Sequence, residues 1–177
     1  LRYFTHLTGI DSLSTEIKDC SLNRLTNLTK LCLMNNPVIT DEGIKGLNKI
    51  KNLNLNENSR ISDKGLKKLT NLTYLNLANN SKITNNVFKK LTGLIELNLR
   101  ENTNITDESL SHLSLLSHLD ISENKKITIN GINQLHINSL DMSNFSLITD
   151  NEIINFSTRI SYLNIGSNIN ITDKGVQ

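Results

Sequence analysis

Residues 28–36 read LTKLCLMNN, and this stretch carries the pattern that decides the fold. Leu31 and Leu33 are separated by a single residue, and this alternation is typical of a short β-strand with one buried face. An asparagine, Asn36, closes the stretch. The pattern LxxLxLxxN begins again, at a constant spacing of 22 residues, at Ile50, Leu72, Leu94 and Leu116.

Two further copies of the pattern begin at Ile137 and Ile160, after steps of 21 and 23 residues. Such regular self-similarity is the signature of a repeat protein, in which each unit packs against its neighbours. Phe145 replaces the closing asparagine in the copy that begins at Ile137. We therefore expect a local kink or repacking at Phe145.

A second pattern follows each asparagine and predicts a short helix. In its first full copy it consists of Ile39, Thr40 and Asp41, followed by Ile44 and Leu47. A Thr-Asp or Ser-Asp pair can cap the first turn of a helix, and apolar residues three apart share one helical face. Further copies begin at Ile61, Ile83, Ile105, Ile127, Ile148 and Ile171.

The two patterns together resemble the leucine-rich-repeat family over nearly the whole chain. The resemblance implies an α/β solenoid, a curved horseshoe fragment with a parallel β-sheet on the concave face and short helices on the convex face. Strand spacing of about 4.8 Å and helix spacing of about 8–10 Å agree with that curvature, because the wider helical layer must lie outside. The resemblance also implies that the closing asparagines turn inward and bind backbone groups.

The repeats predict that residues 1–177 form a single leucine-rich-repeat domain of about eight units. The first unit is degenerate, and we expect its strand near Leu7–Ile10. The last unit is truncated at Gln177, before its final leucine, so we expect the natural chain to continue beyond residue 177.

Composition argues against several classes of partner. The net charge is only +2, which gives no strong attraction to nucleic acid or to an anionic membrane. The sequence also lacks the run of about 18 apolar residues that a membrane span requires. Two cysteines, Cys20 and Cys32, are too few for a disulfide framework, so we expect free thiols in a reducing, cytoplasmic compartment. We expect a monomer that binds neither nucleic acid nor membrane.

The strand positions between the leucines should face outward on the concave sheet. One such position is almost always Asn or Asp, and it admits two interpretations: a solvent-facing ladder of mutually hydrogen-bonded side chains, or a polar floor beneath a partner. Its members are Asn54, Asn76, Asn98, Asp120, Asp141 and Asn164.

Aromatic and charged residues among these outward positions indicate a protein-binding surface, since Tyr and Arg are enriched at binding hot spots. We expect Tyr74, Glu96 and His118 to be neighbours on consecutive strands, with Arg100 beside Glu96. The excess of acidic residues predicts a partner with a basic contact surface. The full set of predicted partner-binding residues is Tyr74, Glu96, Arg100, His118, Asp120, Asp141 and Tyr162.

A catalytic role is disfavoured, because the sequence lacks the phosphate-loop, dinucleotide and zinc-protease motifs. His118, Glu96 and Asp120 could form a metal or general-base site, but an open, flat sheet has no walls that exclude water or shift pKa values. We therefore predict that the protein is not an enzyme and uses no cofactor and no metal.

The predicted function is a non-catalytic protein–protein interaction module that binds a partner through its concave sheet. The short units rich in Asn, Ile and Lys resemble leucine-rich-repeat effectors of intracellular bacteria, which implies inhibition or regulation of a partner in the host cytoplasm. The alternative is the substrate-recognition part of a larger enzyme or ubiquitin-ligase adaptor, because the ITDxGI and ISDxGL segments resemble the repeats of F-box receptors. The 22-residue period, and Asn where those receptors have Cys, depart from that second pattern.

Overall fold

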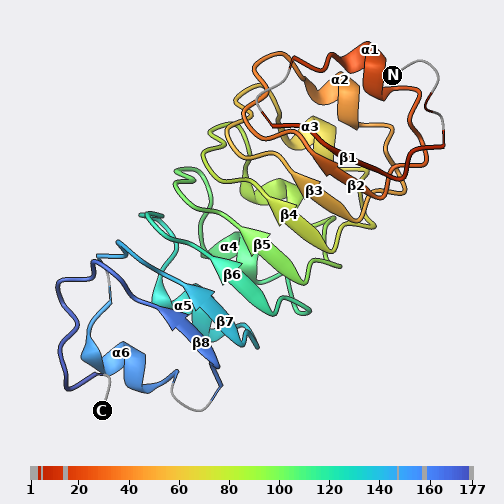
Figure 1. The fold of residues 1–177 in the computed structure, drawn as a ribbon. Coiled ribbons are helices and arrows are strands. Elements are labelled where there is room, and N and C mark those ends of the chain that lie inside the picture. The colour runs from red at the N-terminus through yellow and green to blue at the C-terminus, as the bar shows by residue number, and fades with distance from the viewer. Residues whose placement is uncertain (1–3, 5, 14–15, 147, 157–158, 176–177) are drawn as a thin grey trace.

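A computed structural model describes residues 4, 6–13, 16–146, 148–156 and 159–175. Within them, eight short strands form one parallel sheet whose strand order follows the chain (Figure 1). The strands are β1 (Gly9–Asp11), β2 (Lys30–Cys32), β3 (Asn52–Asn54), β4 (Tyr74–Asn76), β5 (Glu96–Asn98), β6 (His118–Asp120), β7 (Ser139–Asp141) and β8 (Tyr162–Asn164). The predicted parallel sheet is confirmed, and its first strand overlaps the stretch expected at residues 7–10.

Short helices connect the strands and form a second layer behind the sheet (Figure 1). They are α1 (Asp19–Leu22), α2 (Asp41–Ile44), α3 (Asp63–Leu66), the 3-10 helix η1 (Asn85–Val87), α4 (Asp107–Leu110), α5 (Ile129–Asn133) and α6 (Asp150–Ile154). From α1 to α5 each helix lies beside the next, and all eight strands pair in chain order, which confirms the α/β solenoid. None of the described helices has the length and hydropathy of a membrane-spanning segment.

The core lies between the two layers and consists of stacked repeat leucines. Leu31, Leu53 and Leu75 are register partners on consecutive strands and are at most 1% exposed. Burying one such side chain contributes about 1.5–3 kcal/mol relative to leaving it exposed. Because each leucine contacts its counterparts in the adjacent repeats, the stacking both stabilises the core and sets the register of the sheet.

Buried asparagines connect consecutive repeats, as the resemblance implied. The side-chain amide of Asn80 donates to the carbonyl oxygen of Leu55 at 2.8 Å, and that of Asn102 donates to Leu77 at 2.7 Å. Each of these carbonyl oxygens also accepts from a backbone amide at 3.1 Å, so the side chain adds a second, buried hydrogen bond that joins two repeats. Such a bond contributes about 0.5–1.5 kcal/mol to stability. Equivalent inter-repeat bonds are made by Asn36, Asn58, Asn124 and Asn168.

Phe145, where this asparagine is missing, is accommodated by repacking. Its side chain is fully buried in the core, so a phenyl ring fills the position of the amide. The strands on either side keep their register, with Leu119 opposite Leu140 and Leu140 opposite Leu163. Of the two outcomes expected at Phe145, the structure shows repacking without loss of strand pairing.

The Thr-Asp pairs do more than the predicted helix capping. The Thr40 hydroxyl does accept a hydrogen bond from the Glu42 amide, as a capping residue should. However, the backbone amide and hydroxyl of Thr40 also donate to the two carboxylate oxygens of Asp19, at 2.9 and 2.6 Å. The aspartate of one repeat therefore holds the start of the next helix. The same pairing links Asp41 to Ser62, Asp63 to Thr84, Asp107 to Thr128 and Asp150 to Thr172.

A recurrent glycine makes room for these aspartates. A Cβ atom on Gly65 would lie 2.6 Å from a carboxylate oxygen of Asp41 and 3.1 Å from its Cα. Val87 occupies the position equivalent to Gly65 in the next repeat, and it follows Asp63 in the sequence as Gly65 follows Asp41. There the chain forms the 3-10 helix η1 in place of the α-helical turn of its neighbours. The bonds from Thr84 to Asp63, at 2.9 and 2.6 Å, are nevertheless the same as in the neighbouring repeats.

The strands end at a rim where the backbone adopts the left-handed conformation. This holds at Asn35, Glu57, Asn79, Glu101, Glu123, Asn144 and Ser167, with φ between 54° and 62°. Asparagine tolerates this region, whereas glutamate has no local hydrogen bond that offsets its steric cost. At Glu57 the amide still donates to the Ala78 carbonyl at 3.0 Å, so the strained conformation is maintained by pairing with the next repeat.

Replacing Gly65 with alanine should destabilise the protein by about 1–3 kcal/mol, because the new methyl group displaces the Asp41 carboxylate. Gly46→Ala is the matched control, since a Cβ there meets no atom within 4 Å. We expect the control to be neutral or slightly stabilising in urea denaturation. Equal losses of stability in the two variants would contradict the close-approach explanation.

Replacing Glu57 with asparagine should stabilise the protein by about 0.5–1 kcal/mol, because asparagine adopts the left-handed conformation at lower cost. The reverse change, Asn79→Glu, should destabilise it by a similar amount. Both are measured by urea denaturation. If the two changes shift stability in the same direction, the backbone conformation is not the cause.

Candidate protein-binding surface

The concave face displays the strand side chains that the leucine core does not use. The register pairs Tyr74 with Glu96 and Glu96 with His118 across β4, β5 and β6. These three side chains are therefore consecutive neighbours along the sheet, as the repeat spacing predicts. Tyr74 is half-buried, and Glu96 and His118 are exposed.

An open depression of about 240 Å³ lies over β4 to β7. Five of the seven predicted partner-binding residues line it: Tyr74, Glu96, His118, Asp120 and Asp141. Asn98 and Ser139 complete its polar lining. The structure thus brings most of the predicted residues into one hollow on the concave face, while their contact with a partner stays a prediction.

A second depression, of about 390 Å³, continues the first toward the N-terminal end of the sheet. It is lined in part by Lys30 and Asn52 and shares Tyr74 and Glu96 with the first depression. Lys30 and Asn52 are not among the predicted partner-binding residues. Their strand position is the same as that of Tyr74, and this equivalence was the available signal.

The Asn/Asp position beside these residues has a structural role that the sequence analysis described only in part. Asp120 Oδ1 accepts from the backbone amide and hydroxyl of Ser122, at 2.9 and 2.6 Å. Its Oδ2 accepts from the Asn98 side chain at 2.6 Å, which is a rung of the expected ladder. A similar set surrounds Asp141, which binds Ser143 and Asn164. The bond to the backbone two residues ahead turns the chain at the strand end.

Arg100 and Tyr162 lie outside the lining of both depressions. Arg100 pairs with Glu101 at 3.2 Å and with Glu123 at 2.5 Å, so its side chain extends along the rim. Its described ion pairs do not include Glu96, beside which it was expected. Tyr162 is 58% exposed on β8. The predicted set therefore divides into five residues of the depression and two residues apart from it.

Two pKa shifts follow from this environment. Burial raises the pKa of the Tyr74 phenol, the nearby Glu96 carboxylate raises it further, and a hydrogen bond with Asn76 opposes both effects. Tyr74 therefore remains neutral. Although partial desolvation acts against it, the carboxylates of Glu123 and Glu101 raise the pKa of the Arg100 guanidinium. Because this pair network is exposed, it contributes little to stability.

Within the described part of the chain, no group of three His, Cys, Asp or Glu side chains is arranged to hold a metal ion. His118, Glu96 and Asp120, which the sequence brought forward as such a group, share the depression without forming one. Cys20 and Cys32 are both free thiols, and Cys32 is buried under the concave face.

Comparisons with known proteins agree with this architecture. A family model described as "Leucine Rich repeat" matches residues 24–47, 46–69 and 68–86. No curated protein matches the sequence. Among solved structures, the yeast Rad7–Elc1 complex contains a chain that is 20% identical, with a TM-score of 0.76 over 98% of this chain and 53% of that one. The internalin InlF of Listeria monocytogenes is 24% identical, with a TM-score of 0.65 over 95% and 56%.

The present chain thus spans little more than half the length of these two proteins, and at such identities the likeness shows the fold alone. Internalin C2 of Listeria monocytogenes is 31% identical, with a TM-score of 0.74 over 97% of this chain and 74% of that one. Repeats of this kind generally form non-catalytic scaffolds for protein–protein interaction. The chain belongs to the leucine-rich-repeat family.

Proposed function

We propose that this protein binds a partner protein in the two joined depressions of its concave face and regulates that partner by covering part of its surface. The proposal rests on a difference between two adjacent strand positions: side chains at one position are hydrogen-bonded within the protein, whereas charged side chains at the other have no described hydrogen bond. Side chains at the Asn/Asp position bind their own backbone, as Asp120 does. The Glu96 and His118 side chains have no hydrogen bond or ion pair among the described contacts, and they line a hollow.

The shape and chemistry of the surface suit a protein partner. The Tyr74 ring is half-buried, so its position is already restricted before a partner binds. It therefore loses little mobility on binding and suits the role of an aromatic anchor. A curved sheet several strands wide offers a larger contact area than a small-molecule pocket. The repeat scaffold keeps the strand register, so the surface is formed before the partner arrives.

The charge of the depression supports a partner with a basic contact surface. Glu96, Asp120 and Asp141 line its C-terminal part, and Glu123 lies on the rim beside it. Such complementarity chiefly raises the association rate and the selectivity for one partner. In the N-terminal depression the positive charge of Lys30 offsets that of Asp11, so we expect the basic part of the partner to lie over β5 to β7.

A regulatory role similar to that of bacterial effectors is favoured over the substrate-recognition part of an enzyme or ubiquitin-ligase adaptor. The 31% identical structure over most of both chains is that of a bacterial protein, internalin C2. The likeness to yeast Rad7 is at 20% identity and supports only the shared fold.

The partner contact can be mapped with a photo-crosslinking residue placed at Asn52 on the concave face. A second variant carries the same residue at Asn86 in the helical layer, and both positions are exposed. We expect crosslinks from Asn52 only. The triple variant Tyr74→Ala/Glu96→Ala/His118→Ala should weaken binding of the crosslinked partner by about a hundredfold, equal to about 2.7 kcal/mol.

The control variant Lys125→Ala/Lys126→Ala/Asn130→Ala changes exposed residues away from the sheet and should bind like the wild type. Circular dichroism establishes that both variants are folded. Crosslinks from Asn86 alone, or equal binding by the concave variant and the wild type, would show that the concave depression is not the contact surface.

A further inference from the structure

Charge is divided along the solenoid. Residues 45–90 contain ten Lys and Arg residues and two acidic ones, whereas residues 96–175 contain five and ten. The net charge of +2 conceals this division. Residues 45–90 therefore carry a local positive field that the concave depressions do not account for.

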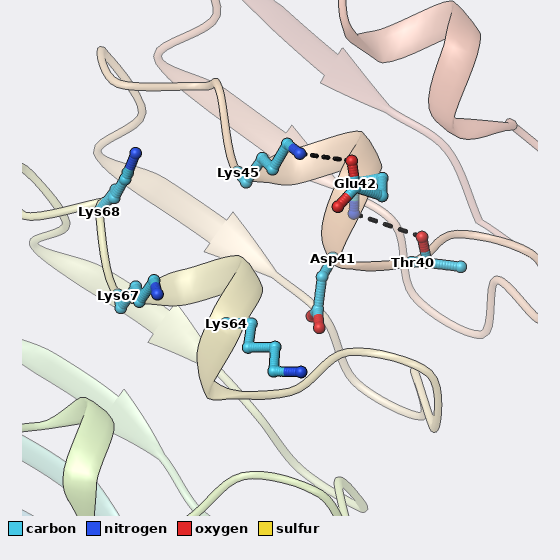
Figure 2. A pocket seen from close by; sticks show the side chains of 7 residues that line it. All are labelled: Thr40, Asp41, Glu42, Lys45, Lys64, Lys67 and Lys68. Atoms are coloured by element: carbon cyan, nitrogen blue, oxygen red, sulfur yellow. Dashed lines mark hydrogen bonds and ion pairs between the residues drawn. The ribbon is translucent and has the colours of Figure 1, made fainter.

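Four of these ten basic residues line a hollow in the helical layer between α2 and α3. This hollow has a volume of about 530 Å³ and is lined by Thr40, Asp41, Glu42, Lys45, Lys64, Lys67 and Lys68 (Figure 2). Lys64 belongs to α3, and Lys45 and Lys67 are the C-cap residues that directly follow α2 and α3. The hollow faces away from the predicted partner site.

The acidic side chains of the hollow are already engaged. Glu42 pairs with Lys45, as the dashed line in Figure 2 shows. Both carboxylate oxygens of Asp41 accept hydrogen bonds from Ser62, at 2.8 and 2.6 Å. These two hydrogen bonds fix the Asp41 carboxylate against Ser62 of the next repeat, and none of the described ion pairs joins it to a lysine.

Three of the ammonium groups, those of Lys64, Lys67 and Lys68, have no ion pair among the described contacts. Lys89, at the equivalent place one repeat after Lys67, differs because it pairs with Glu108 at 3.1 Å. That bond lowers the pKa of the Glu108 carboxyl. The hollow therefore groups three ammonium groups without a described ion pair, although other such lysines, for example Lys90 and Lys125, lie outside it.

The chemistry of the lining selects a class of anion. Its four cations are all lysines, which act as mobile point charges, and the lining contains no arginine that could form a planar fork with a carboxylate. It also contains no aromatic ring on which a nucleic-acid base could stack. Charges arranged around a hollow match a compact ligand with several negative groups close together.

We propose that this hollow binds a compact anion with clustered phosphate groups. The anion lies between α2 and α3, where Lys64, Lys67 and Lys68 contact its oxygens. This hollow is separate from the concave depressions, because the sites share no lining residue.

Calorimetric titration with inorganic tripolyphosphate at low ionic strength tests the proposal. The variant Lys64→Gln/Lys67→Gln/Lys68→Gln should weaken binding by at least about tenfold. The control Lys125→Gln/Lys126→Gln/Lys174→Gln removes the same number of charges from exposed positions elsewhere and should weaken binding by less than about twofold. Both sets are exposed, so both variants should fold.

Absence of tripolyphosphate binding by the wild type, or equal weakening in both variants, would overturn the proposal. So would a hexaglutamate peptide that binds as tightly as tripolyphosphate, since the hollow would then respond to charge alone. Vesicles that carry a bisphosphorylated inositol lipid distinguish two sources of the anion. Vesicle binding that tripolyphosphate displaces identifies a lipid headgroup, and tripolyphosphate binding without vesicle binding identifies a free oligophosphate; both support the clustered-phosphate site.

Discussion

No repeat of this protein can satisfy its own backbone, and this constraint underlies the rest of the structure. A three-residue strand has partners only in the strands before and after it, so every repeat depends on its neighbours. Three sets of contacts meet this requirement. Leucines stack at the core, buried asparagines such as Asn80 bind carbonyls of the preceding repeat, and aspartates such as Asp41 hold the start of the next helix. The glycine at position 65 and the left-handed rim residues follow from the same close stacking.

The same constraint separates structural from available positions. Residues that connect repeats are occupied by their own bonds, as Asp120 and Asp141 are even though they face the concave surface. Glu96 and His118 stand at positions that stacking does not need, and so do Lys64 and Lys67 in the helical layer. The fold thus leaves one acidic and one basic hollow on different faces of one scaffold. We infer that both hollows are binding sites, and that their opposite charges select different ligands.

Features that repeat with a constant period could be predicted from the sequence, and features that depend on contacts between repeats could not. The strand positions and the adjacency of Tyr74, Glu96 and His118 follow from the 22-residue spacing, and the inward Asn80 follows from the resemblance to the leucine-rich-repeat family. The hydrogen bond from Thr40 to Asp19 joins residues 21 apart. It could not be predicted, because helix capping alone already explains why threonine and aspartate occur at these positions. The direction of the Arg100 side chain depends on Glu123 in the next repeat. Each of these needed three-dimensional neighbours.

The central claim is that buried hydrogen bonds between repeats stabilise the binding scaffold, whereas exposed hydrogen bonds between repeats contribute little. Urea denaturation of Asn80→Ala and Asn71→Ala tests it most directly, because both side chains donate to a backbone carbonyl of the preceding repeat, at 2.8 and 2.7 Å. Asn80 is buried and Asn71 is exposed, so water can replace only the second bond. The account predicts a loss of about 1–3 kcal/mol for Asn80→Ala and less than about 0.5 kcal/mol for Asn71→Ala. Losses of equal size, or no loss for Asn80→Ala, would contradict it.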